Sequence, residues 1–242
     1  MMELAGSAFK EELLERVREL ERKLKEKEAE VRALSEKAKT ASLFEFSEKG
    51  LRLKLYRFLL KKYSALLNEK EKKTIGEVKA LIDGSDLTIQ SLVSEFKGNS
   101  YEFERDFLSA AEKAFEFVKK EIAYVKLDLD LDFFMSPLEI MTEKVADDED
   151  KAIFLCSMLF ALGDESASVV IAELDDLSTH AFVVLEFDEK VFFLDASQEH
   201  GFSEFSGTTS EVLKKYSFEG HKIRKLLYKF NHFEYKSFVE EG

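Results

Sequence analysis

The N-terminal part of the chain has a heptad pattern of apolar positions among Glu, Lys and Arg. Over residues 8–39 the apolar positions are spaced alternately by four and three, with one polar interruption at Lys27. They are Leu13, Val17, Leu20, Leu24, Val31, Leu34 and Ala38. This spacing predicts a helix that pairs in a coiled coil, either between two chains or with another helix of the same chain. The alternative is a single amphipathic helix that lies on its own domain.

A break in the pattern at residues 40–50 predicts a linker, and residues 51–122 form a predicted helical region. The segment 51–67 is apolar at helical spacing and is expected to be a buried helix. Glycines at 84 and 98 are expected to end two further helices. The predicted N-caps are Asn68 for the helix that ends at Gly84, Ser85 or Asp86 for the segment 87–97, and Asn99 or Ser100 for a long helix to about Tyr124.

Residues 123–242 have a different pattern and are predicted to form an α+β domain. "VKLDLDLDFF", after Tyr124, alternates between apolar and polar residues, which is typical of a half-buried strand. "SVVIAELD", "HAFVVLEFD", "KVFFLDA" and "HKIRKLLYKF" are β-rich segments separated by turn residues. Asp150 to Leu162 is predicted to be a central helix before a mainly antiparallel sheet, and Tyr228 to Phe238 to be a core-facing edge strand.

Composition narrows the possible partners of the chain. It has 242 residues and a net charge of −13, so nucleic acid is not an expected partner. A single cysteine excludes an intrachain disulfide, and no stretch is typical of a membrane span or a signal peptide, so we expect a cytoplasmic protein. Many Glu and Lys residues with few amides are typical of a thermophile.

We expect no cofactor and no bound metal. The expected partner is another protein or a second copy of the chain, bound through residues 8–39.

Three ordered motifs then suggest a family. Pro137 and Glu139 are followed by "ADDEDKA" at 146–152 and by the apolar stretch "IFLCSMLFALG". "HAFV" begins at His180, and "FFLDAS" places Asp195. Over roughly residues 85–200 this order resembles transglutaminase-like domains of archaeal and bacterial type. The resemblance implies a papain-like core, with a central helix on an antiparallel sheet and preceding helices. It covers neither the coiled-coil segment nor the last forty or so residues.

The resemblance implies a catalytic triad at positions 148, 180 and 195, but one member is replaced. In such a site a histidine takes the proton of a cysteine thiol, a carboxylate orients the histidine, and a helix N-terminus lowers the thiol pKa. Here His180 and Asp195 match the base and its orienting group. Asp148 stands at the thiol position, and Ala146 stands where the family has glycine. We therefore expect vestigial triad positions rather than an active enzyme.

Three interpretations of the chain follow. The first is a non-catalytic, transglutaminase-like protein that binds or scaffolds a protein partner through its cleft and coiled coil. The second is a metal-dependent hydrolase in which Asp148, His180 and Asp195 bind a divalent cation. The third is a cysteine peptidase or amidase that uses Cys156, which lies eight residues further along the helix among apolar neighbours.

Overall fold

A computed structural model of the protein describes residues 50–55, 58, 74–126 and 134–238. The chain divides into two compact units, Met1–Leu51 and Arg52–Gly242, and the description below concerns the second. The predicted coiled-coil helix at 8–39 lies outside the described residues, as do the linker at 40–50 apart from Gly50 and most of the predicted helix at 51–67. Residues 51–55 of that helix are helical, and Leu55 is buried. The predicted domain boundaries (8–39, 40–50, 51–122 and 123–242) stay predictions.

Two helices that precede the core begin at side-chain caps. Helix α3 (Ile75–Ala80) begins at Thr74, which forms a capping box with Glu77. The predicted cap Asn68 lies outside the described residues. Helix α4 (Leu87–Lys97) begins and ends where the sequence predicted, because the Asp86 carboxylate accepts hydrogen bonds from the backbone N–H groups of Thr88 and Ile89.

Helix α5 (Phe103–Glu121) begins later than predicted. Neither Asn99 nor Ser100 caps it: its N-cap is Glu102, which makes no side-chain cap bond. Instead, the carboxylate of Asp106 in the first turn accepts a hydrogen bond from the backbone N–H of Glu102 at 2.9 Å. This hydrogen bond from a downstream side chain satisfies the backbone N–H of Glu102 at the start of the helix. It explains why the chain stays extended past Ser100.

A short two-stranded sheet and one helix connect α5 to the core. Strand β1 (Ala123–Tyr124) pairs in parallel with β2 (Val145–Ala146). Between them, α6 (Pro137–Glu143) starts from a capping box of Ser136 and Glu139 with proline in its first turn. Most of the predicted strand in "VKLDLDLDFF" lies outside the described residues, so that prediction is untested.

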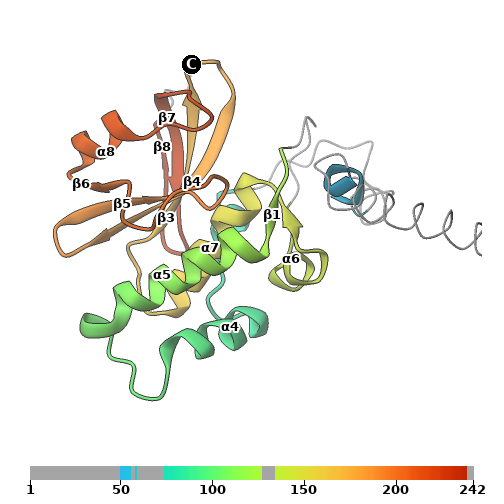
Figure 1. The fold of residues 1–242 in the computed structure, drawn as a ribbon, viewed down its shortest axis with the longest axis vertical. Coiled ribbons are helices and arrows are strands. Elements are labelled where there is room, and N and C mark those ends of the chain that lie inside the picture. The colour runs from blue at the N-terminus through green and yellow to red at the C-terminus, as the bar shows by residue number, and fades with distance from the viewer. Residues whose placement is uncertain (1–49, 56–57, 59–73, 127–133, 239–242) are drawn as a thin grey trace, which may run out of the picture. The chain divides into compact units, whose positions relative to one another are not determined.

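The core contains the predicted antiparallel sheet. Its six strands lie in the order β6-β5-β4-β3-β7-β8, and every neighbouring pair is antiparallel (Figure 1). Their bounds are β3 Ser168–Leu174, β4 Thr179–Phe187, β5 Lys190–Leu194, β6 Ser206–Gly207, β7 Ile223–Phe230 and β8 Tyr235–Ser237. The four β-rich segments correspond to β3, β4, β5 and β7. The prediction of one core-facing edge strand over Tyr228 to Phe238 was wrong: this stretch holds the end of β7, a turn and the edge strand β8, which is half-buried or exposed.

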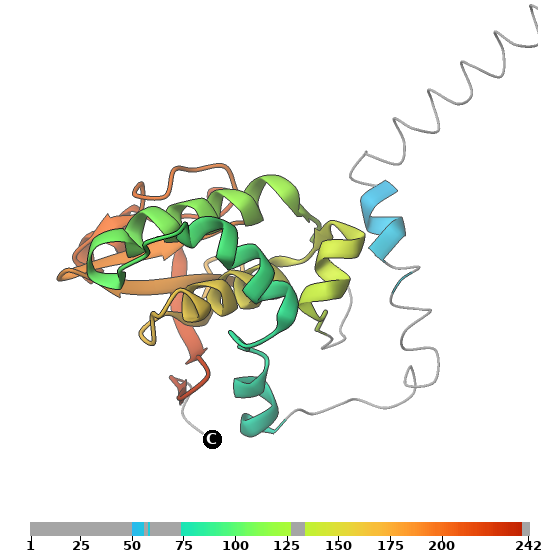
Figure 2. The same cartoon turned by 90° about the horizontal axis from the view of Figure 1, so that it is seen from below.

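The central helix α7 (Asp148–Ala161) packs between this sheet and the preceding helices. It contacts β3 and β4 on one side and α4 and α5 on the other (Figures 1 and 2). The residues from Asp150 to Leu159 are all buried, which explains why the segment is apolar on every side. The helix begins two residues earlier than predicted, because the Asp147 carboxylate accepts a hydrogen bond from the N–H of Asp150. The predicted α+β core with a central helix on an antiparallel sheet is therefore confirmed.

A second apolar cluster covers the opposite face of the sheet. Val170, Ala172, Phe182 and Phe193 from the strands pack there with Tyr216. Tyr216 follows helix α8 (Thr209–Lys215), which starts from a capping box of Thr208 and Glu211. Among the helices that the structure describes, none is long and apolar enough to cross a membrane.

Candidate functional site

The first residue of α7 places a carboxylate against strand β4. The Asp148 side chain is 18% exposed, and its Oδ2 accepts a hydrogen bond from the backbone N–H of Ala181 at 2.8 Å. The partial positive charge at the start of a helix stabilises an anion at this position. Asp148 is therefore anchored by a neighbouring strand as well as by the start of its own helix.

His180 lies between two carboxylates. It is on β4 and only 1% exposed. Its Nδ1 is 2.8 Å from Oδ2 of Asp148, and its Nε2 is 2.9 Å from Oδ2 of Asp195. The Nε2 atom and Asp195 form a hydrogen bond. The Nδ1 atom and Asp148 are close enough for an ion pair, but their geometry does not meet the criteria of a hydrogen bond. The three residues that the motifs singled out thus meet in space, and both ring nitrogens face a carboxylate.

Asp195, directly after β5, is the most enclosed member of this group. It is fully buried, and its Oδ2 also accepts hydrogen bonds from the Tyr216 hydroxyl and the Gln198 amide, each at 2.7 Å. Its Oδ1 accepts from the backbone N–H of Ser197 at 2.9 Å. Burial would raise the pKa of Asp195, but the charge of His180 and these donors outweigh it and hold the pKa below its usual value.

The two carboxylates decide the charge of His180. Burial favours the neutral ring, but the charges of Asp195 and Asp148 and their close contacts outweigh it and raise the pKa of His180 to about 9. The ring is therefore an imidazolium at neutral pH. A histidine that already carries its proton cannot take one from a nucleophile.

An aromatic ring covers the imidazolium. Phe218 stacks on His180 with ring centroids 3.5 Å apart and planes inclined by 13°. Phe218 is itself 4% exposed and meets Tyr124 of β1 edge to face. It is held in a tight turn, because Phe218 and His221 exchange backbone hydrogen bonds and Glu219 and Gly220 between them have positive φ. The ring face of His180 is thus closed by protein, and the stacking favours the charged form.

The N-cap Asp147 adds a second perturbed carboxyl group beside the site. Burial and the neighbouring charge of Asp148 raise the pKa of Asp147 to about 7. Lys151, one turn along the same helix, is 2% exposed and donates a hydrogen bond to the carbonyl of Ile122 at 2.7 Å. Burial lowers the pKa of Lys151 to about 8. The start of α7 therefore contains a half-buried carboxyl group and a buried ammonium group whose pKa values lie near neutrality.

The geometry does not favour a metal bound by Asp148, His180 and Asp195. A cation needs its donor atoms around one point, but here the imidazole ring separates the two carboxylates. Within the described part of the chain, three such donors gather at Asp175, Asp176 and His221, where they lie within 4.8 Å of one another. There His221 Nδ1 is already 2.7 Å from an Asp175 oxygen, and Asp175 and Asp176 are exposed.

Cys156 does not join the site. It is 1% exposed within α7, and burial raises the pKa of its thiol far above the usual value. The nitrogens of His180 face Asp148 and Asp195 instead. The thiol therefore has neither the deprotonated form nor the base that a cysteine nucleophile needs.

Several residues that build the site carried no signal in the sequence. Tyr216, Gln198 and Phe218 come from the loop and helix region after β5; Tyr216 and Phe218 lie outside the stretch that resembles a known family, and Gln198 lies near its end. His200, which had no evident partner in the sequence, places Nε2 2.8 Å from the backbone oxygen of Asp195. Only Gln198 was close enough along the chain to suggest a contact with Asp195.

Comparison with known proteins yields structural similarity only. No family model matches the chain, and no curated protein matches it. Legionella pneumophila LapG is 15% identical over 76% of this chain and 88% of its own, with a TM-score of 0.46. A calcium-bound structure of LapG is 17% identical over 76% and 90%, with a TM-score of 0.44. A TGase is 15% identical over 69% of this chain and 44% of its own, with a TM-score of 0.35. None of these similarities assigns a function to this chain.

Proposed function

We propose that the protein is a non-catalytic, transglutaminase-like module that acts by binding another protein. One observation carries this proposal: a carboxylate, Asp148, stands 2.8 Å from the nitrogen of His180. A carboxylate at this point leaves no thiol to attack a substrate and keeps the base protonated. The Asp148–His180–Asp195 group, which we call the ion triad, then serves to hold α7, β4 and the end of β5 together.

The energetics of the ion triad agree with a structural role. A charged group buried alone is costly, but here the imidazolium lies between two carboxylates. Asp195 accepts three further hydrogen bonds from side chains and backbone, and Asp148 accepts one. Removing one partner would leave a buried charge without compensation. We infer that these three residues serve the stability of the fold and the shape of the surrounding surface.

Protein binding is the function that suits the rest of the chain. The heptad pattern at 8–39 offers a pairing surface, and the described residues expose several large apolar side chains. These include Leu87 at 86%, Leu138 at 64%, Leu177 at 66% and Phe233 at 50%. Because they are scattered over different elements, we assign the binding role first to the heptad segment.

Turnover assays test the absence of catalysis. We expect the purified chain to show no hydrolysis or acyl transfer on a broad panel of amide, ester and peptide substrates beyond that of a His180→Ala variant. The variant controls for contaminating activity, because the same purification is applied to both proteins. Turnover by the wild type that is lost in His180→Ala would contradict the proposal.

Sedimentation equilibrium on the full chain tests the pairing role. We expect self-association that is weakened by Leu20→Glu with Leu24→Glu, which places charges in the predicted seam. Arg22→Glu, between them at an outward position of the same heptad, is the matched control and should leave self-association unchanged. Equal masses for all three proteins would remove the heptad segment as a self-association surface.

A further inference from the structure

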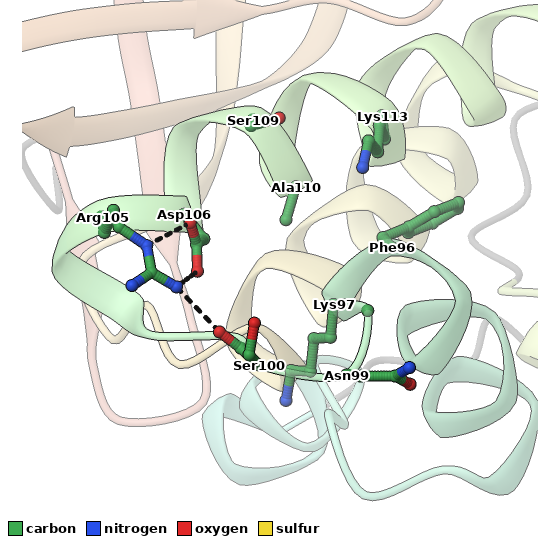
Figure 3. Close-up of a pocket in the computed structure, with 10 residues that line it drawn as sticks. Phe96, Lys97, Asn99, Ser100, Arg105, Asp106, Ser109, Ala110 and Lys113 are labelled. Atoms are coloured by element: carbon green, nitrogen blue, oxygen red, sulfur yellow. Dashed lines mark hydrogen bonds and ion pairs between the residues drawn. The ribbon is translucent and has the colours of Figure 1, made fainter.

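A second polar site lies between the end of α4 and the first turns of α5. The structure has a pocket of about 220 Å³ there, and Phe96 and Ala110 contribute apolar surface to it (Figure 3). The polar part of the lining includes Arg105, Ser109 and Lys113 of α5. In Figure 3 the ammonium group of Lys113 lies across the pocket from the Arg105–Asp106 pair.

The pocket is positively charged within an acidic protein. Lys97, Arg105 and Lys113 line it against one carboxylate, Asp106, whereas the whole chain has a net charge of −13. Glu102 does not line the pocket but pairs with Arg105 at 2.9 Å, so three cations against two carboxylates leave an excess of one positive charge. An anion that the protein surface repels in general would therefore find a local attraction here.

Two of the cations already have partners and are fixed in position. Lys97 donates to the carbonyl of Ala161 at 2.8 Å. The Arg105 guanidinium donates through Nε and Nη2 to the two oxygens of Asp106, through Nη1 to Glu102, and through Nη2 to the carbonyl of Ser100. Of its five N–H groups, one is left to face a ligand.

Four polar side chains of the lining are left without a hydrogen bond or ion pair, although the charge of Lys113 acts on Asp106. Among the described residues, the side chains of Asn99, Ser100, Ser109 and Lys113 make no hydrogen bond or ion pair, although all four line the pocket. Together they offer an ammonium, two hydroxyls and an amide to a bound group. This donor-rich set suits a ligand with several acceptor oxygens.

The size of the pocket limits what it binds. Sites for whole cofactors and drug-sized ligands have volumes of roughly 300–1,000 Å³, and this pocket is smaller. One charged side chain of a larger molecule fits it better than a free cofactor does. A phosphate monoester has about two negative charges and three acceptor oxygens at neutral pH, and these oxygens suit the donors of the lining.

We propose that this pocket binds the phosphate group of a phosphorylated serine or threonine side chain in a partner peptide. The site is distinct from the ion triad and does not depend on the role proposed for it. Beside the pocket, Lys97 and Tyr101 donate hydrogen bonds to the carbonyls of Ala161 and Leu162 at the C-terminal end of α7. Asp148 lies in the first turn of that helix. The 14 residues of α7 span roughly 20 Å at about 1.5 Å per residue.

Amide chemical shifts of the intact protein test this site. The probes are the peptide Ac-Ala-phosphoSer-Ala-NH₂, the same peptide with serine or glutamate at the centre, and inorganic phosphate. We expect the phosphopeptide to shift the amides of residues 99–113 and to bind about tenfold more tightly than the serine peptide. Lys113→Gln should weaken that binding about tenfold, because it removes a charge-assisted contact. Lys190→Gln, which removes the same charge from β5, is the control and should have no effect.

Several results would overturn the assignment. Equal binding of phosphoserine and serine peptides, or no shifts at residues 99–113, would remove the site. Equal binding of the glutamate peptide would show that any carboxylate suffices and that the phosphate specificity is wrong. Binding of inorganic phosphate alone, insensitive to Lys113→Gln, would show an adventitious ion only. Thermal unfolding of Lys113→Gln at the wild-type temperature would confirm that the variant is folded.

Discussion

The charge state of His180 makes stability fall as pH rises through neutrality. The folded protein keeps the His180 proton up to about pH 9, whereas an unfolded histidine loses it near the usual value of 6.5. The folded state therefore binds more protons between these values, and its free energy of unfolding decreases as pH rises. The contribution is complete below pH 6.5. It is lost by about pH 9 and amounts to roughly 3.5 kcal/mol, from a pKa difference of about 2.5 at about 1.4 kcal/mol per pKa unit.

Two neighbouring groups define the pH range in which His180 can be isolated. Asp147, with a pKa raised to about 7, adds its own loss of stability between about pH 4 and 7. Lys151 has the opposite sign: its pKa is lowered to about 8, so stability is regained as pH rises from about 8 to 10.5. Between pH 7 and 8, His180 dominates, and we expect a decrease of about 1.4 kcal/mol per pH unit.

Urea unfolding at closely spaced pH values measures this slope, and the NMR signals of the His180 ring report its pKa directly. Asp148→Asn is the matched variant, because it removes one of the two charges and keeps the side-chain shape. We expect it to lower the His180 pKa and to flatten the slope between pH 7 and 8. A ring that titrates at or below 6.5 in the wild type, with a flat stability profile, would show that the two carboxylates do not hold the proton on His180.

Three further predictions follow from single residues. Asp147→Asn should keep the helix cap and flatten the fall in unfolding free energy between about pH 4 and 7; an unchanged profile in urea would contradict the raised pKa. Phe218→Ala should destabilise the protein by about 3 kcal/mol, as for other buried Phe→Ala changes, and a loss below about 1 kcal/mol would mean that the stacked ring contributes little. Cys156 should react with iodoacetamide at pH 8 only in denaturant, and rapid labelling of the native chain would show that α7 opens.

The core could be predicted because its elements have strong local patterns. Strands β3, β4 and β5 are continuous apolar segments bounded by turn residues, and helix α4 has Asp86 and Gly98 at its ends. Helix α6 was missed although its signal was present: Ser136, Pro137 and Glu139 form a capping box with proline in the first turn. The same signal at Thr208 and Glu211 preceded α8.

The site could be predicted only where its residues lie in ordered motifs. Asp148, His180 and Asp195 were identified in that way, and the structure brings them together. The start of α5 was wrong because a carboxylate four residues downstream, Asp106, replaced a conventional cap. Phe218 could not be found, because a contact between the ring of a turn residue and a histidine 38 positions earlier leaves no local pattern in the sequence.

Restoring a thiol at position 148 tests most directly whether the ion triad occupies the positions of a catalytic site. In an Asp148→Cys variant, the thiol would lie at the start of α7 beside His180, which Asp195 holds in place. The helix N-terminus and the imidazolium should lower its pKa below the free value of about 8.5. The measurement is the pH-rate profile of iodoacetamide alkylation, followed by peptide mass. We expect this thiol to be alkylated faster at pH 7 than Cys156, and the added His180→Ala change to slow its alkylation. If the introduced thiol titrates at about 8.5 or above whether or not His180 is present, positions 148, 180 and 195 do not form a catalytic site.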